Sequence, residues 1–173
     1  MRRIVITGCS GGGKSSLIKE LSIAGHTTVE EPGRRVIASE RANGGTGFPW
    51  ADAERFANLA FWMAVGDHAA ATADLTFFDR SALDQAAWFA RQGTVPPGEV
   101  PRYDPLVFLV PPWPEIYVTD ADRQHGFGAA LEEYTDLTKR LREWGYRCEL
   151  LPKAPVTERA DFVLKRIPRE VAA

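Results

Sequence analysis

The chain has 173 residues, of which 45% are hydrophobic, and a formal net charge of -2 at pH 7. This length and hydrophobic content fit one core, so we expect residues 1–173 to form a single domain. Because there is no basic excess, neither nucleic acid nor an anionic membrane is an expected partner. The two cysteines, Cys9 and Cys148, belong to no C-x-x-C or Cys/His cluster, which argues against a zinc site or a disulfide framework. No apolar run is long enough for a signal peptide or a membrane-spanning helix, and we expect a cytoplasmic protein.

Residues 8–15 carry the most specific motif in the chain. They read Gly-Cys-Ser-Gly-Gly-Gly-Lys-Ser, which fills the P-loop pattern G-x-x-x-x-G-K-[ST] directly behind a strand expected over about residues 2–7. In such a loop, glycines let successive backbone N–H groups turn inward around phosphate oxygens, and the following helix adds its positive N-terminus. The strand-loop-helix context favours a triphosphate site over a plain glycine-rich turn.

The motif also predicts what each position does. The Lys14 ammonium is expected to reach the β- and γ-phosphates of ATP, and the Ser15 hydroxyl is expected to bind Mg²⁺. The loop and the first helical turn supply the expected phosphate contacts: Gly8, Ser10, Gly11, Gly12, Gly13, Lys14, Ser15 and Ser16.

Two glutamates close the second expected strand, which covers residues 26–30. The carboxyl edge of a parallel sheet forms a ligand crevice, and Pro32 biases Glu31 toward an extended conformation over that crevice. A carboxylate there can accept the proton of an attacking hydroxyl, so Glu31, three residues before Arg34, is the candidate general base. The alternative is an acid placed favourably at the N-terminus of the helix expected over residues 32–41.

The glycine-rich segment 43–47 is expected to be a flexible linker that moves. Asp52 can then cap a long helix. The side chains Phe61 and Trp62 on this helix are expected to pack and not to form a cofactor platform. The buried stripe of the helix is expected from its i, i+3, i+4, i+7 spacing: Phe56, Leu59, Ala60 and Met63.

Residues 75–78 form a compact apolar strand that runs into Asp79-Arg80-Ser81. An acid directly after an apolar strand is the Walker B arrangement, so Asp79 is expected beside the P-loop as a ligand of Mg²⁺, with helix capping as the alternative. Hydrolytic motors usually place a second acid next. Arg80 stands there instead, which favours phosphoryl transfer over hydrolysis; a structural ion pair is its alternative role. Ser81 and Asp84 have capping-box spacing, which gives Asp84 a mostly structural role.

Two basic residues in the second half of the chain are candidate nucleotide contacts. Arg123 lies in the charged segment 120–125, where a lid over the phosphates is expected; a solvated charged turn is the alternative. Lys153 follows the last expected strand, residues 146–151, where its aliphatic stem can cover the nucleotide base. The other elements expected in this half are a loop over 91–105, a strand over 106–110, and helices over about 131–144 and 156–167.

Five short apolar segments therefore alternate with amphipathic helices, and no repeat or low-complexity tract interrupts them. The pattern predicts an α/β sandwich in which helices cover both faces of a parallel sheet.

Several of these motifs occur together in one known family. The marks are Gly8–Ser15, Glu31 with Arg34, Phe78-Asp79-Arg80, residues 112–117 with Asp120 and Arg123, and Pro155-Val156 with Arg159. In their order and spacing they resemble the kinase-like P-loop proteins grouped as small AAA-type ATPases and related to the ribosylnicotinamide kinase domain. The resemblance implies a P-loop NTPase sandwich with five parallel strands in the order 2-3-1-4-5. In similar kinases of nucleosides and nucleotides, the residues that Asp79, Arg80 and Glu31 resemble flank the phosphoryl acceptor.

These observations favour a kinase that uses Mg²⁺ and ATP, with ATP as phosphoryl donor and a small, nucleoside-like metabolite as acceptor. Lys14, Ser15 and Asp79 would position the donor, Glu31 would act as base, and Arg80 with Arg123 would stabilise the moving phosphoryl group. The chain has no N-K-x-D motif for guanine and no D-x-x-G switch motif. The alternative is a switch or binding module that responds to ATP or GTP, has weak NTPase activity and acts on a protein partner.

Overall fold

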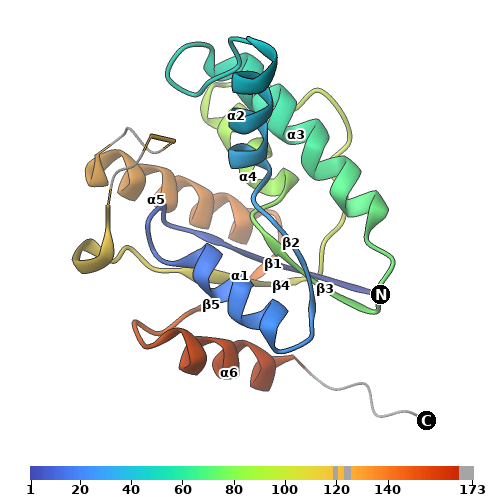
Figure 1. Ribbon diagram of the computed structural model, residues 1–173, viewed down its shortest axis with the longest axis vertical. Coiled ribbons are helices and arrows are strands. Elements are labelled where there is room, and N and C mark those ends of the chain that lie inside the picture. Colours follow the sequence, from blue (N-terminus) through green and yellow to red (C-terminus); the bar gives the residue numbers. More distant parts are fainter. Residues whose placement is uncertain (119–120, 123–125, 168–173) are drawn as a thin grey trace.

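The computed structural model describes residues 1–118, 121–122 and 126–167. Within these residues, five strands form one parallel sheet in the order β2-β3-β1-β4-β5, and helices cover both of its faces (Figure 1). The predicted fold class and strand order are confirmed. The elements are β1 (Arg2–Gly8), α1 (Lys14–Ile23), β2 (Thr27–Val29), α2 (Pro32–Asn43), α3 (Ala53–Ala70), β3 (Leu75–Asp79), α4 (Ala82–Arg91), β4 (Leu106–Val110), the 3-10 helix η1 (Pro114–Ile116), α5 (Phe127–Glu143), β5 (Arg147–Leu150) and α6 (Val156–Arg166).

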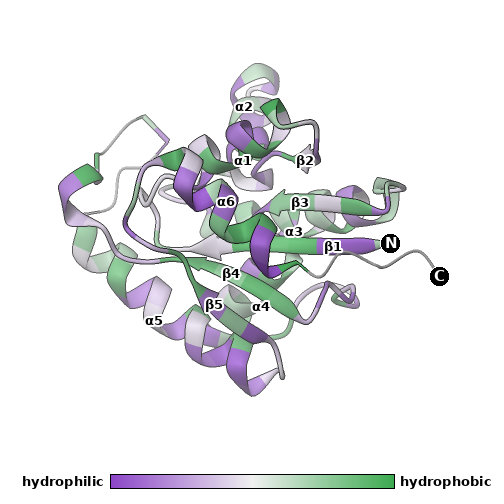
Figure 2. Ribbon diagram, turned by 90° about the horizontal axis from the view of Figure 1, so that it is seen from below, coloured by the Kyte–Doolittle hydropathy of each residue, from purple (hydrophilic) through white to green (hydrophobic). Residues whose placement is uncertain are grey.

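The core has two layers because successive side chains of a strand point to opposite faces of the sheet. Ile4 and Ile6 of β1 pack with α1 and α6 on one face, whereas Val5 packs with α3, α4 and α5 on the other. All five residues of β4 are buried, as expected for a strand covered on both sides. Figure 2 shows these apolar strands between helices that carry hydrophilic residues on their outer sides. Across the described part of the chain, no helix combines the length and the apolarity needed to cross a membrane.

Helix α3 buries a different face from the one that the spacing of its apolar residues predicted. Its buried residues are Ala57, Ala60, Phe61 and Ala64, while the expected Phe56, Leu59 and Met63 are only half-buried. The cause is that α3 packs between α2 and α4, and small alanine side chains let neighbouring helices approach closely. Phe61 is fully buried as expected, but Trp62 is 53% exposed; its ring lies against the loop at Gly98 and, edge-on, against the ring of Phe61.

The glycine-rich segment 43–47, expected to be a flexible linker, makes hydrogen bonds to the end of α2. The backbone N–H of Gly45 donates to the carbonyl oxygen of Glu40 at 2.8 Å, and the N–H of Gly47 donates to Oε2 of Glu40 at 2.7 Å. Arg55 of α3 holds the same carboxylate at 3.3 Å. A Cβ at Gly45 would lie 2.3 Å from Oε2 of Glu40, so the glycine is what lets the carboxylate fold back onto the segment.

The strand order decides which loops meet. Because β2, β3 and β1 are neighbours and run parallel, their carboxyl ends lie side by side at one edge of the sheet. The P-loop follows β1, Asp79 ends β3, and Glu31 lies two residues after β2. Three segments that are distant in the sequence are thereby brought to one place.

Candidate active site

The P-loop leaves the end of β1 and lies against the end of β4. Gly8, Gly11 and Gly13 have φ of 113°, 78° and 78°, a region that favours glycine. Gly12 has an ordinary φ, but a Cβ there would lie 2.2 Å from Cγ1 of Val110. The glycines therefore fix both the turn of the backbone and its close approach to β4.

The serines of the motif are spread around the loop. Ser10 lies on the wall of the cavity described below, while Ser15 and Ser16 are exposed in the first turn of α1. The hydroxyl of Ser15 donates to Oδ2 of Asp79 at 2.9 Å. The two predicted Mg²⁺ ligands are thus in direct contact.

Lys14 is buried beneath the loop. Its Nζ donates to the carbonyl oxygen of Cys9 at 2.7 Å and to that of Gly8 at 3.4 Å. Burial lowers the pKa of Lys14 to about 8, and Arg80 adds to this effect, while Asp79 and Glu31 oppose it. A buried ammonium group that donates only to neutral carbonyls is strongly stabilised when an anion approaches it.

Asp79 is buried at the end of β3, and one of its oxygens is unsatisfied. Oδ2 is occupied by Ser15, but Oδ1 has no hydrogen-bond partner among the described residues. Burial raises the pKa of Asp79 to about 6, and the negative charge of Glu31 adds to the increase. An orphaned, buried carboxylate oxygen beside a serine hydroxyl is a donor set that fits Mg²⁺, a cation that takes one or two protein oxygens together with phosphates.

Arg80 is held in an unusual backbone conformation. Its φ of 62° is the one positive value of a non-glycine residue in the described ranges. Nε lies 3.2 Å from Oε1 of Glu31, and Nη1 lies 3.0 Å from Oδ1 of Asp84. Burial lowers the pKa of Arg80, but the carboxylates of Glu31, Asp84 and Asp79 together outweigh it, and the pKa lies above its ordinary value. The guanidinium is fixed between two acids that stand 53 residues apart in the sequence.

Glu31 is the residue that precedes α2, with Pro32 in the first turn behind it. Its backbone is extended, with φ of -52° and ψ of 120°, as the following proline favours. Besides Arg80, its carboxylate lies 3.7 Å from Nε of Arg34. The structure therefore brings Glu31, Arg80 and Asp79 together at one edge of the sheet.

Asp84 does more than cap a helix. The capping box at the start of α4 is present. The side chain of Ser81 accepts from the backbone N–H of Asp84, and Oδ2 of Asp84 accepts from the backbone N–H of Ser81. Oδ1 of Asp84 also accepts from the hydroxyl of Thr7, at the end of β1, and from Arg80. The i, i+4 spacing of Arg80 and Asp84 could have indicated this pair, whereas the contact with Thr7 depends on the tertiary fold.

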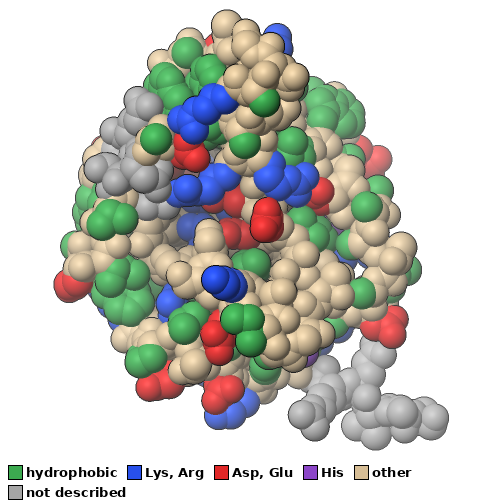
Figure 3. Space-filling model, in the orientation of Figure 1, with side chains coloured by type: hydrophobic (Ala, Val, Ile, Leu, Met, Phe, Trp, Pro, Cys, Tyr) green, Lys and Arg blue, Asp and Glu red, His purple; other side chains and the backbone are tan. Residues whose placement is uncertain are grey.

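A cavity of about 380 Å³ opens next to Glu31 and Arg80, between α2, α3, α4 and α5. Figure 3 shows acidic and basic side chains gathered on this face of the molecule, below the helix pair α2 and α3. The other walls of the cavity combine aromatic and polar side chains: Phe56, Gln85, Trp88, Arg91, Glu133 and Asp136. Sequence reasoning identified none of these six as site residues, since they meet only when four helices are packed together.

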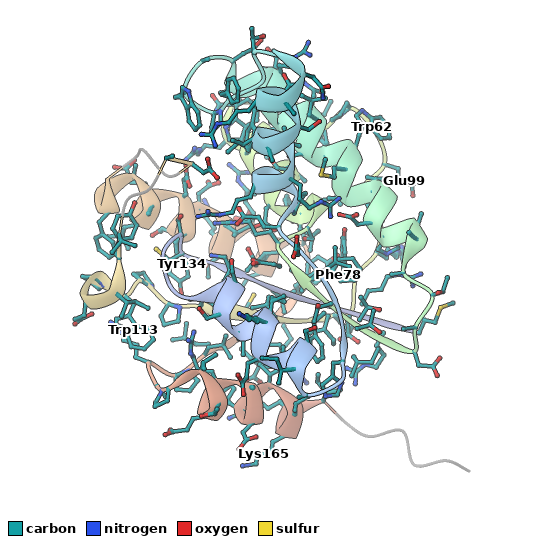
Figure 4. All side chains as sticks on the ribbon, viewed as in Figure 1. Trp62, Phe78, Glu99, Trp113, Tyr134 and Lys165 are labelled. Atoms are coloured by element: carbon teal, nitrogen blue, oxygen red, sulfur yellow. The ribbon has the colours of Figure 1, made fainter. Side chains whose placement is uncertain are left out.

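Two further nucleotide contacts were predicted in the second half of the chain, Lys153 and Arg123. Lys153 lies exposed in the loop after β5, with Nζ 4.0 Å from Oε2 of Glu115. Arg123 lies outside the described residues. On the opposite side of the P-loop stands a residue for which no role was predicted: Arg159 of α6, whose guanidinium contacts both the loop and the ring of Trp113 (labelled in Figure 4).

Comparisons with known proteins agree with this fold. A family model described as an AAA domain matches residues 3–159. Deoxyadenosine kinase from M. mycoides with bound dATP has a TM-score of 0.63 at 12% identity, with 96% of this chain and 98% of that chain covered. The same kinase with the products dCMP and dCDP gives 0.61 at 12% identity, with 95% and 97% covered. The NadR protein in complex with NR gives 0.65 at 18% identity, with 99% of this chain but 54% of that chain covered. No curated protein matches the chain.

Proposed function

We propose that this chain, which belongs to the AAA domain family of P-loop proteins, is a Mg²⁺-dependent kinase. Its fold is that of nucleoside kinases. It transfers the γ-phosphoryl group of ATP to a hydroxyl group of a small, nucleoside-like metabolite. The observation that carries this proposal is Arg80, held between Glu31 and Asp84 at the edge of a cavity and directly after Asp79. An enzyme that only hydrolyses ATP can also use a base and an arginine, but it has no need of a cavity for a second substrate beside them.

The donor side of the site consists of the P-loop, Lys14, Ser15 and Asp79. Lys14 would exchange its carbonyl partners for the β- and γ-phosphate oxygens, and the loop amides would surround the phosphates. The hydroxyl of Ser15 and the unsatisfied Oδ1 of Asp79 would hold Mg²⁺. When it is bound, Mg²⁺ neutralises charge that develops on the phosphate oxygens.

On the acceptor side, Glu31 would accept the proton of the attacking hydroxyl. The hydroxyl oxygen then forms a bond to the γ-phosphorus, the bond from that phosphorus to the β,γ-bridging oxygen breaks, and ADP leaves. Arg80 lies 3.2 Å from Glu31, so it can contact the same hydroxyl or the phosphoryl group as it moves. We assign Arg123 to the same charge stabilisation on the strength of its sequence position.

The charges of the cavity favour an acceptor without a phosphate group. Among its described lining residues, carboxylates outnumber guanidinium groups by five to three: Glu31, Asp84, Asp122, Glu133 and Asp136 against Arg34, Arg80 and Arg91. Each of these arginines already lies within 4 Å of a carboxylate of the cavity. A phosphorylated acceptor would add negative charge where positive charge is already neutralised, so a neutral or cationic acceptor fits better.

The acceptor can be identified by incubating the protein with Mg²⁺, ATP and pools of nucleosides, aminoglycosides, sugars and their phosphates. Mass spectrometry of each pool should reveal a product heavier by one phosphoryl group, with the Lys14→Ala variant as blank. We expect the product among the unphosphorylated nucleosides. If every pool stays unmodified while ATP is bound, the kinase proposal is wrong and a nucleotide-dependent switch replaces it.

Glu31→Gln tests the base directly. We expect kcat for phosphoryl transfer to fall by about 10² to 10⁴, because the amide cannot accept the proton, while the Kd for ATP changes by less than about threefold. Glu30→Gln, one residue earlier, is the matched control and should retain full activity. Unchanged transfer by Glu31→Gln would exclude Glu31 as the base.

A further inference from the structure

We infer that Arg159 is a positioning residue for the donor nucleotide: it orients the Gly12–Gly13 peptide of the P-loop and, together with α1, the Gly13–Lys14 peptide, so that their N–H groups face the phosphates. The inference rests on the proposed nucleotide site and adds to it a residue from the opposite end of the chain. Arg159 lies on α6 and is 6% exposed. Its Nη1 donates to the carbonyl oxygens of Gly12 and Gly13, at 3.3 and 3.2 Å.

Because peptide groups are planar and trans, these two contacts with carbonyl oxygens also fix the direction of two N–H groups. In a planar trans peptide the C=O and N–H bonds point in opposite directions, and the described residues contain no cis peptide. The carbonyl of Gly12 belongs to the same peptide as the N–H of Gly13, and the carbonyl of Gly13 belongs to the same peptide as the N–H of Lys14. Both carbonyls accept from Arg159, so both N–H groups point away from it. The carbonyl of Gly13 also accepts from the N–H of Leu17 in α1, at 3.2 Å, so α1 and Arg159 jointly hold the Gly13–Lys14 peptide. For the Gly12–Gly13 peptide, the contact with its carbonyl comes from Arg159.

These two N–H groups are available to a ligand. Among the described residues, no backbone carbonyl accepts from the N–H of Gly13 or of Lys14. They stand at the start of α1, where the helix N-terminus attracts anions. Fixed in this direction before nucleotide binds, they need no rearrangement when the phosphates arrive.

The loop is shaped to receive the guanidinium. A Cβ at Gly13 would lie 3.1 Å from both Nη1 and Nη2 of Arg159, so a larger residue there would push the side chain away. On its other side the guanidinium lies 5.6 Å from the ring centre of Trp113, which shields it from water. Glycine and tryptophan therefore enclose the side chain between loop and solvent.

Within the part of the chain that the structure describes, no carboxylate neutralises the charge of Arg159. No acid among the described residues lies within ion-pair distance of it, and its buried Nε has no hydrogen-bond partner there. Burial alone lowers the pKa of Arg159. A purely structural arginine is normally paired with an acid, whereas an unpaired one directly behind the P-loop adds attraction for the negative phosphates.

The test compares two arginines of the same helix. Arg159→Met removes the charge and the donors at similar volume, and Arg159→Lys keeps the charge but cannot make the same two hydrogen bonds. Arg166→Met is the matched control, because Arg166 also lies over an aromatic ring, that of Phe162, and pairs with Glu149, away from the loop. We expect the Kd for ATP and for ADP, measured by calorimetry with Mg²⁺, to rise about tenfold or more in both Arg159 variants and less than twofold in Arg166→Met.

Two further measurements separate positioning from folding. In a ¹⁵N-labelled wild-type protein, ATP should shift the amide signals of Gly13 and Lys14, and this shift should be reduced in Arg159→Lys, which serves if Arg159→Met does not fold. Arg159→Ala should regain ATP affinity when a few millimolar guanidinium is added, because the small cation can occupy the space left behind. Wild-type affinity for ATP in folded Arg159 variants would overturn the inference. A wild-type protein that binds no nucleotide would overturn the proposed function itself.

Discussion

At Asp79, the stability of the fold and the proposed binding of Mg²⁺ make opposite demands on the same carboxylate. The side chain is buried, has one oxygen without a hydrogen-bond partner among the described residues, and has a pKa of about 6. The folded protein therefore resists the ionisation that a Mg²⁺ ligand requires. Such local instability is common where a protein is prepared for a ligand that supplies the missing interaction.

The consequence is a stability difference between Asp79→Asn and the wild type that depends on pH. The carboxylate has a pKa of 3.8 without its surroundings and about 6 in the fold, so between these values the folded protein binds more protons than the unfolded chain. Wild-type stability at this site is therefore lost as pH rises from about 4 to about 6. Asparagine does not ionise, and we expect Asp79→Asn to equal the wild type near pH 4 and to exceed it by about 2 kcal/mol at pH 7.

Urea unfolding of both proteins at pH 4, 5, 6 and 7 measures this difference, and the wild type supplies the background from all other groups. In the same variant, Mg²⁺-dependent ATP affinity should fall, since the amide is a poor ligand for the cation. A variant less stable than the wild type at pH 7 would show that the hydrogen bond from Ser15 outweighs the burial of charge.

The proposed catalytic residues could be predicted from the sequence where the signal was local. Asp79 and Arg80 stand directly after an apolar strand, and Glu31 stands before Pro32, so each position could be read from a few neighbours. The second role of Asp84 and the role of Arg159 were not predicted. Both depend on contacts with the loop region, Thr7 for one and Gly12 and Gly13 for the other, that the sequence places 77 and more than 140 residues away.

Among the elements, α4 shows how a helix start supports the site. Its capping box satisfies backbone N–H groups at the N-terminus and at the same time places Asp84 against Arg80. The box follows from the four-residue spacing Ser-Ala-Leu-Asp, which is why it could be predicted. The burial of α3 could not be predicted in the same way, because helices pack on both of its sides and the apolar pattern alone does not choose between Ala57 and Phe56.

Ser81→Ala should lower the free energy of unfolding by about 1 kcal/mol, since the N–H of Leu83 loses the hydroxyl that now accepts its hydrogen bond at 3.2 Å. Chemical denaturation measures the loss. Ser22→Ala, on the exposed side of α1, is the control and should change stability by less than about 0.5 kcal/mol. Equal effects of the two substitutions would mean that the cap contributes nothing to stability.

For the molecule as a whole, the site exists only in the folded chain. The carboxyl ends of β1, β3 and β2 supply its three parts, and these parts come together through the sheet order. A ligand that binds only this arrangement stabilises the whole fold.

We therefore expect ATP with Mg²⁺, at about 100 times its Kd, to stabilise the wild type by about 2.7 kcal/mol. For a chain of this size, that corresponds to an increase in Tm of about 5–10 °C, measured by calorimetry. Removing Mg²⁺ with a chelator should reduce the increase. Lys14→Ala should show almost none, and an undiminished increase in this variant would contradict the assignment of Lys14 to the phosphates.

The sequence by itself determined the P-loop, the alternation of strands and helices, the capping box and the acid-arginine pair after β3. Each of these depends on residues within a turn or two of one another, and short-range geometry limits what they can form. The tertiary structure alone decided the ion pair of Glu31 with Arg80, the face that α3 buries, the cavity with its excess of carboxylates, and the contact of Arg159 with the loop. These depend on strand order and on how helices pack, because side chains from separate elements meet only when apolar surfaces are buried together.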